Sequence, residues 1–143
     1  AVTVRFELIP EGAEEEPMDL LAWTTTPWTI PGNRGIAFSA EDKYGIYEVT
    51  AITESSKALI GERLVLADKL AESVREVAHI ESWCRVSDAN ELNGTICAHP
   101  WRGKGFDFDV PVLPGEFVTM EQGTGLVHIG PGHGTDDFNF ALF

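Results

Sequence analysis

Apolar and polar residues alternate along the first segment of the chain. Val2, Val4, Phe6 and Leu8 are separated by single polar residues. This period of two predicts a strand with one buried face. Comparable runs, bounded by glycine, proline or polar turns, predict further strands at residues 19–23, 35–39, 45–52, 80–86, 107–113, 116–120 and 125–129.

A different period marks residues 67–78 as a helix. Leu70, Ala71, Val74, Val77 and Ala78 recur at three- and four-residue spacing, with charged residues on the opposite face. A second helix is predicted at 136–143, with Thr135 as its candidate N-cap. Strands and helices do not alternate regularly, so we expect one strand-rich, mixed α/β domain over residues 1–143 rather than a doubly wound sheet.

The charge of the chain limits its partners. Its formal net charge is −13, with only 10 Lys and Arg residues. Because phosphate backbones are held mainly by Lys and Arg, an independent binder of long nucleic acid is disfavoured, although a pocket for one nucleotide is not. No apolar run reaches the roughly 20 residues of a membrane span. Two cysteines, Cys84 and Cys97, suit a reducing compartment.

Two segments contain residues that are poor choices for fold alone. In the first, Thr24, Thr25 and Thr26 lie between a predicted strand and a proline-stiffened turn that continues to Asn33. Threonine hydroxyls both donate and accept hydrogen bonds, so three of them on a rigid turn could orient a water or support an oxyanion. The alternative is that threonine is simply a good strand residue.

The second segment runs from Gly123 to Phe138. A predicted strand ends near His128, a glycine-rich loop follows, and Asp136 and Asp137 open the second predicted helix. An aspartate in a first helical turn can serve the helix dipole alone. Alternatively, one of the two carboxylates faces a pocket and binds a cation. The residues by themselves leave both interpretations open.

Together the two segments resemble a known family. TTTPWT-x-P-x-N, followed by GTG-x-VH-x-x-P-x-x-G-x-DD, is similar to the editing insertion of the class I aminoacyl-tRNA synthetases for isoleucine, valine and leucine. Within that group, Thr26, Pro27, Trp28 and His128 follow the isoleucine pattern. The resemblance implies a β-barrel-like core with peripheral helices, in a domain that belongs to a larger synthetase.

The resemblance also implies roles for individual residues. Thr24, Thr25 and Thr26 match positions around the scissile ester and the terminal adenosine, and Asn33 matches a polar position nearby. Trp28 and His128 match the walls of the amino-acid pocket. Asp137 matches the carboxylate that binds the α-ammonium, and Asp136 then caps the helix. A general-base role for His128 stays open, since imidazole titrates near neutral pH.

The implied activity is hydrolysis of valyl-tRNA(Ile), and of valyl-adenylate as a further candidate substrate. A catalytically inactive module that binds the aminoacyl end, or a valine or leucine editing domain, are the alternatives. The expected partners are the 3′ end of tRNA(Ile) carrying valine and the rest of the synthetase. We expect a cytoplasmic monomeric domain without a membrane partner or cofactor, and no metal site, because the Cys and His residues lack compact zinc-ligand spacing.

Overall fold

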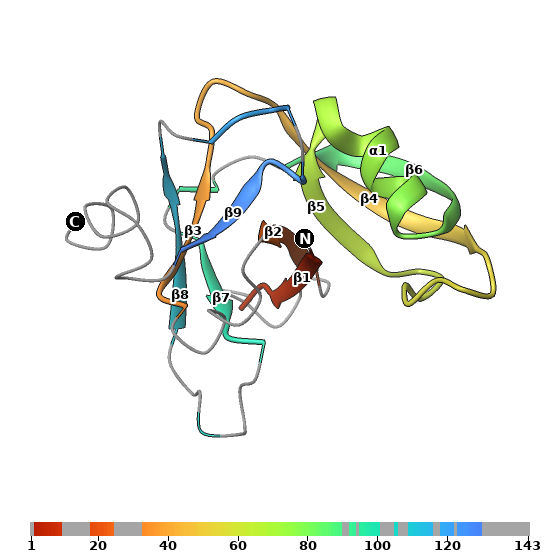
Figure 1. The fold of residues 1–143 in the computed structure, drawn as a ribbon, viewed down its shortest axis with the longest axis horizontal. Helices are drawn as coiled ribbons and strands as arrows, with labels where there is room; N and C mark the ends of the chain where they lie inside the picture. The colour runs from red at the N-terminus through yellow and green to blue at the C-terminus, as the bar shows by residue number, and fades with distance from the viewer. Residues whose placement is uncertain are drawn as a thin grey trace.

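The computed structural model describes residues 2–9, 18–24, 33–89, 92–93, 95–100, 105, 109–115, 118–121 and 123–129. This part of the chain forms nine strands and a short helical segment (Figure 1). The elements are β1 (Val2–Glu7), β2 (Asp19–Thr24), β3 (Gly35–Phe38), β4 (Tyr44–Ile52), β5 (Arg63–Ala67), η2 (Asp68–Leu70), α1 (Ala71–Val77), β6 (Ile80–Asp88), β7 (Ile96–Ala98), β8 (Asp109–Pro114) and β9 (Leu126–Ile129).

The predicted strands at 2–8, 19–23, 35–39, 45–52, 80–86 and 125–129 are confirmed to within two residues, and 107–113 corresponds to β8. The patterns do not predict two further strands. After Arg63, β5 is an uninterrupted apolar run that merges into the helix pattern, and β7 has only three residues. The strand predicted at 116–120 is wrong for 118–120, which are not in a strand, and Val118 N–H donates to the Gly115 carbonyl at 3.3 Å. The second predicted helix lies outside the described residues.

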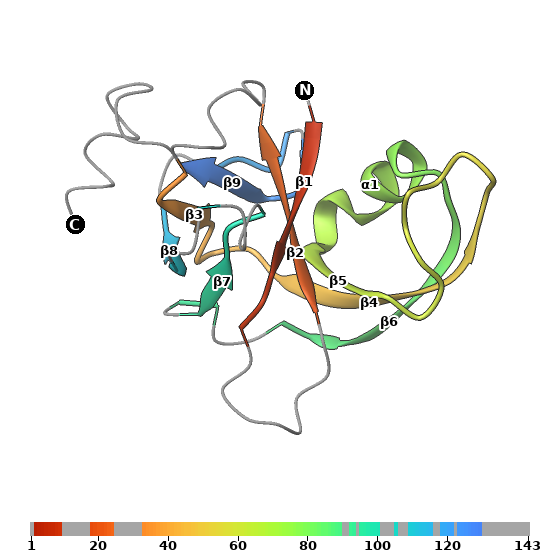
Figure 2. The same ribbon diagram turned by 90° about the horizontal axis from the view of Figure 1, so that it is seen from below.

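The strands curl into a barrel-like sheet. Its order is β6-β4-β5-β2-β9-β3-β8-β7, and β1 pairs with the remaining edge of β2. Beyond the end of β1, an isolated bridge joins Leu8 to Cys97 of β7, and Ile9 N–H donates to the Ile96 carbonyl at 2.9 Å. These contacts bring the β7 end of the sheet back to β1, so six strands surround a common interior (Figure 2). The expected mixed, strand-rich barrel-like fold is confirmed.

One edge of β2 is shared by two different strands. Asp19 and Leu20 pair with β5, whereas Trp23 pairs with β9, both in parallel. The sheet therefore divides along β2. The strands β9, β3, β8 and β7 continue around the barrel, while β5, β4 and β6 extend to the other side as a separate lobe (Figure 1).

The Gly123-Thr124-Gly125 motif lies at this division. Thr124 is 1% exposed, and its hydroxyl donates to the Leu21 carbonyl of β2. Its own carbonyl accepts the Ala67 N–H from the end of β5 at 2.9 Å. Gly123 and Gly125 have φ angles of 84° and 82°, which non-glycine residues rarely adopt. A β-carbon at Gly125 would collide with Ala67, so this motif joins β2, β5 and β9 at contact distance.

Alternation along the strands sets the barrel interior. Phe6 pairs with Leu20, and Phe38 pairs with Leu126; all four are buried. The same inward rows include Ala22, Ile36, Val110 and Val112, which are nearly or fully inaccessible. By the period of two, the next inward positions on β2 and β9 are Thr24 and His128. The apolar interior thus ends in polar side chains at one mouth of the barrel.

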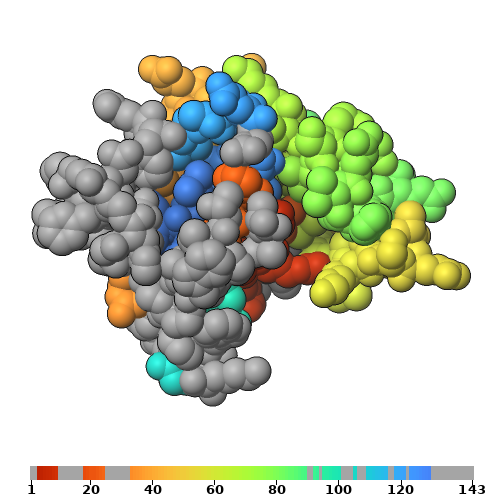
Figure 3. Space-filling model, viewed as in Figure 1, coloured from red at the N-terminus to blue at the C-terminus, as the bar shows by residue number. Residues whose placement is uncertain are grey.

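The single α-helix of the described residues covers the lobe formed by β4, β5 and β6 (Figures 1 and 2). Leu70, Ala71 and Val74 are buried as the helical period predicts. The expectation that Val77 also faces inward is wrong, because Val77 is 73% exposed at the end of α1. The space-filling view shows this region as a distinct lobe on the right of the molecule (Figure 3).

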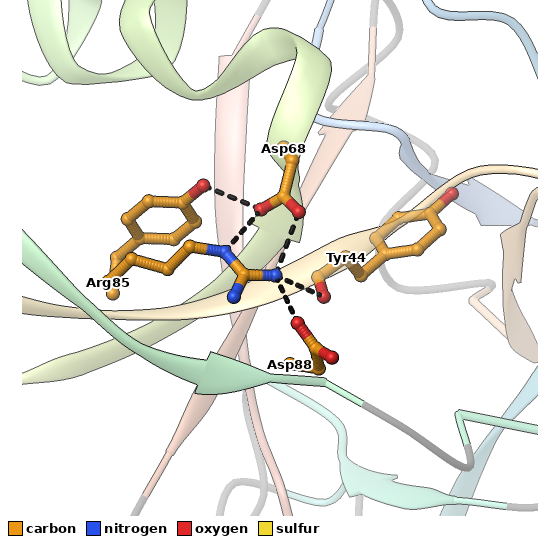
Figure 4. Close-up of polar contacts among 5 residues, drawn as sticks. Tyr44, Asp68, Arg85 and Asp88 are labelled. Carbon is orange, nitrogen blue, oxygen red and sulfur yellow. Dashed lines mark hydrogen bonds and ion pairs between the residues drawn. The ribbon is translucent and has the colours of Figure 1, made fainter.

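Within the lobe, a charged cluster joins β6 to β4 and to the residue that follows β5 (Figure 4). Arg85 of β6 binds Asp68 through two nitrogens, at 3.1 and 2.8 Å, and Asp88 at 2.7 Å. The Tyr47 hydroxyl donates to the same Asp68 carboxylate at 2.6 Å. Burial disfavours ionised Asp68, but the hydrogen bonds from Arg85 and Tyr47 outweigh it and lower the Asp68 pKa. Burial, helped by this bond to Asp68, raises the Tyr47 pKa to about 12.

Glycine-to-alanine substitutions test the strand junction. Gly125→Ala should lower the free energy of unfolding by about 2–5 kcal/mol, because it adds both backbone strain and a collision with Ala67. Gly61→Ala is the matched control: its φ is 90°, but an added β-carbon meets nothing within 4 Å. It should cost only about 1 kcal/mol of backbone strain. If urea denaturation shows equal losses of unfolding free energy for the two variants, the close contact between Gly125 and Ala67 at the junction is contradicted.

The Asp68 cluster predicts a pH-dependent stability. Asp68→Asn should destabilise the fold at pH 7 by about 1–2 kcal/mol, since it weakens a charged, partly exposed hydrogen-bonded pair. The pKa of Asp68 is lowered from 3.8, so this contribution is present above that value and lost as pH falls through the lowered pKa. The difference from the parent protein in urea denaturation should therefore shrink on acidification. The exposed Glu76→Gln control should show little difference at pH 7; a constant Asp68→Asn deficit would contradict this linkage.

Candidate functional site

Three buried polar residues are positioned at one mouth of the barrel. Thr24 is the last residue of β2, His128 lies in β9, and Asn33 precedes β3. Their exposures are 6%, 6% and 0%, respectively. Because Trp23 pairs with Val127, the next residues on these two parallel strands, Thr24 and His128, lie at the same level and on the same face. Residues from both predicted segments therefore meet.

Asn33 and His128 are in direct contact. The Asn33 Nδ2 lies 2.5 Å from His128 Nδ1 and 3.0 Å from the Gly35 carbonyl oxygen. The start of β3 lies beside the end of β9, because Ile36 pairs with His128 in the antiparallel ladder. In addition, Arg34 N–H donates to the Ile129 carbonyl at 2.9 Å. The Asn33 Oδ1 is buried and, in the described part of the chain, has no hydrogen-bond partner.

Four of the predicted site residues fall outside the described residues: Thr25, Thr26, Trp28 and Asp137. Their roles therefore stay predictions. Thr25 directly follows Thr24 in the chain, and residues 130–136, which lead to Asp137, directly follow Ile129. Both segments thus leave the described fold from the strand ends that hold Thr24 and His128.

The sequence alone did not reveal two sets of contacts in this region, those of Thr124 and the contact between Asn33 and His128. Thr124, within the quoted motif, joins three strands through its hydroxyl and carbonyl. Two glycines flanking a threonine were the available signal for such a junction, since glycine permits positive φ and close backbone approach. The contact between Asn33 and His128 joins residues far apart in sequence, so it depends on the register of β3 against β9.

Other candidate chemistry in the described residues is weaker. Burial and, to a lesser degree, Asp19 raise the pKa of the Cys97 thiol to about 12, which keeps it protonated and a poor nucleophile. No three His, Cys, Asp or Glu side chains gather as a metal site there, although His133 and Asp137 are outside that part. No helix in these ranges is long and apolar enough to span a membrane.

A groove of about 520 Å³ lies elsewhere, between β1 and the α1 lobe. On the face shown in Figure 3, red atoms of β1 lie next to green atoms of this lobe. Apolar residues, including Leu64, Val74 and Ile80, form much of the lining. Arg5 also lines it but already pairs with Glu62 and Asp19. Neither Thr24, Asn33 nor His128 belongs to this groove, so it is a separate feature.

The chain has close relatives in sequence. An isoleucine–tRNA ligase from Rhodopseudomonas palustris is 45% identical over 142 residues. The alignment covers 96% of this chain but 14% of that ligase, so the chain spans a small part of the relative's length. No family model matches the chain.

Solved structures resemble the fold. The crystal structure of GlLeuRS-CP1 has a TM-score of 0.75 at 20% identity and covers 96% of this chain and 57% of that one. The editing domain of the Plasmodium knowlesi cytosolic leucyl-tRNA synthetase has a TM-score of 0.69 at 12% identity, covering 99% and 64%. The chain belongs to the isoleucine–tRNA ligase family and has the fold of the synthetase editing domains.

Proposed function

We propose that this domain hydrolyses valine from mischarged tRNA(Ile), at the barrel mouth that holds Thr24, Asn33 and His128. The observation that carries the proposal is the buried Asn33–His128 pair beside Thr24, since it joins one residue from each of the two family-like segments. Buried polar side chains at the end of an apolar interior suit a ligand with an apolar side chain and a polar backbone.

The need for a second site follows from the size of the discrimination. Isoleucine and valine differ by one methylene, which an apolar synthetic pocket distinguishes by only about 1–3 kcal/mol, a limit for which isoleucine–tRNA ligases are themselves the established example. A hydrolytic pocket can apply the opposite test, because adding a methylene to a filled space costs about 1–3 kcal/mol. Valyl esters then enter and are cleaved, whereas isoleucyl esters are excluded. His128 and Trp28 are the proposed walls.

The reacting ester needs orientation more than a strong catalyst. An aminoacyl ester is already reactive, so placement of water and support of the developing oxyanion can supply much of the acceleration. Thr24, Thr25 and Thr26 are the proposed hydroxyl groups for these tasks. Asp137 is proposed to bind the α-ammonium, through a charged hydrogen bond of about 1.5–3 kcal/mol. The proposal requires no covalent enzyme intermediate and no cofactor.

The acidity of the chain limits which part of the tRNA this domain binds. A net charge of −13 repels an extended phosphate backbone. We therefore assign to this domain only the acylated 3′ end, and to the rest of the ligase the body of the tRNA. Valyl-adenylate carries the same aminoacyl group and is a second candidate substrate.

Two alternatives remain distinct. A module that only binds the aminoacyl end would retain the fold without hydrolysis. An editing domain for a valine or leucine enzyme would remove a different amino acid. The presence of all three threonines and Asp137 favours hydrolysis, and the Pro27-Trp28 pair together with the 45% identity to an isoleucine–tRNA ligase favours valine as the substrate.

Deacylation by the full-length ligase tests the reaction. Valyl-tRNA(Ile) should be hydrolysed quickly and isoleucyl-tRNA(Ile) slowly. Asp137→Ala should slow valine release by roughly 10- to 150-fold, the equivalent of one charged hydrogen bond. The adjacent Asp136→Ala is the matched control and should retain most of the rate. No valine release by the parent enzyme would contradict hydrolysis, and an undiminished rate in Asp137→Ala would contradict ammonium binding.

A substitution at the pocket wall tests the basis of selectivity. His128→Ala should increase release of isoleucine from isoleucyl-tRNA(Ile), because it removes bulk at a site that is 6% exposed. The expected gain is about 5- to 150-fold, which matches relief of a one-methylene overlap. The readout is the ratio of isoleucine to valine release. An unchanged ratio would show that another residue forms the steric wall.

A further inference from the structure

The side-chain amide of Asn33 has an unusual set of neighbours. Its nitrogen, Nδ2, faces two hydrogen-bonding atoms: the Gly35 carbonyl oxygen at 3.0 Å and His128 Nδ1 at 2.5 Å. An amide nitrogen carries two hydrogens and accepts none. The Gly35 oxygen can only accept, so one Nδ2 hydrogen is directed to it, and the second is available for the imidazole.

The reverse orientation of the amide is unfavourable. Exchanging the oxygen and nitrogen of Asn33 would place Oδ1 against the Gly35 carbonyl, which brings two acceptors together. It would also replace two donated hydrogen bonds with one accepted bond. The observed orientation leaves Oδ1 buried without a partner in the described residues, which is the lesser loss for a carbonyl. The backbone of β3 therefore fixes which atom of Asn33 faces His128.

This orientation determines the chemistry of the imidazole. Since Nδ2 only donates, His128 Nδ1 must present its lone pair, and a neutral ring then carries its proton on Nε2. We propose that Asn33 is a positioning residue that holds His128 as the Nε2–H tautomer, so that His128 acts as a hydrogen-bond donor and pocket wall rather than as the general base.

This assignment of His128 rests on the proposed editing function, and it narrows the chemical roles that His128 can have in the hydrolysis. In this tautomer Nδ1 is already occupied by the Asn33 hydrogen, and Nε2 has no lone pair to receive a proton from water. Activation of the attacking water must then come from other groups or from the reactivity of the ester itself. A neutral, oriented ring also keeps positive charge away from a site that must receive an α-ammonium.

Nitrogen-15 NMR of the ring tests the tautomer without reference to activity. The 143-residue chain is labelled at histidine, and His128→Gln identifies the signal of His128. At a pH where imidazoles are neutral, Nδ1 should resonate as an unprotonated nitrogen and Nε2 as a protonated one. His79, which lies outside the barrel mouth, provides an internal reference ring. A protonated Nδ1 in the parent chain would overturn the proposal.

Asn33→Asp reverses the hydrogen bond with little change in size. A carboxylate only accepts, so it should draw the proton to His128 Nδ1 and reverse the NMR pattern. Asn93→Asp adds the same charge at an exposed turn and should leave the pattern unchanged. In the full ligase, Asn33→Asp should slow valine release by about 10- to 100-fold, the size of effect seen when a metal-bound histidine loses its orienting partner. An unaltered His128 signal in Asn33→Asp would overturn the positioning role.

The two proposals fail separately. If the parent ligase releases valine but His128 carries its proton on Nδ1, the tautomer assignment is wrong and editing stands. If His128 is the Nε2–H tautomer but the parent ligase releases no valine, the positioning by Asn33 stands and the proposed function is wrong.

Discussion

The hydrogen bonds of Thr124 are the constraint on which the rest of this fold depends. A single strand, β2, must pair with β5 along its first half and with β9 along its second half. Backbone groups at such a branch lose their regular partners, and leaving them unpaired in the interior would cost about 1–3 kcal/mol each. Thr124 supplies a donor to Leu21 and an acceptor to Ala67, while the flanking glycines allow the close approach.

This junction connects the fold to the site through register. It fixes where β9 begins, and His128 follows two residues after Leu126. The antiparallel register of β3 against β9 then brings Asn33 to the imidazole, although the two residues are 95 positions apart. The apolar rows of the barrel end at the same level, so the polar pair lies where an apolar amino-acid side chain could enter. The relative positions of Asn33 and His128 are therefore set by strand pairing.

Sequence patterns predicted those elements whose period is strong. The alternation in β1 and the helical spacing of Leu70 and Val74 each identify an element by local rules. The sequence patterns did not predict β5, because a strand buried on both faces shows no alternation of apolar and polar residues. The site residues came from resemblance to a family, whereas the contact between Asn33 and His128 and the function of Thr124 depend on nonlocal register. No local pattern encodes which strands share an edge of β2.

The proposed site for the aminoacyl end is the mouth of the barrel rather than the groove beside α1. A crystal structure of the chain bound to a nonhydrolysable analogue, with valine joined to adenosine through an amide, distinguishes the two. We expect the valyl side chain against His128, the α-ammonium at Asp137 and the sugar beside Thr24. An analogue bound between β1 and α1, with the ring of His128 uncontacted, would contradict the proposed site.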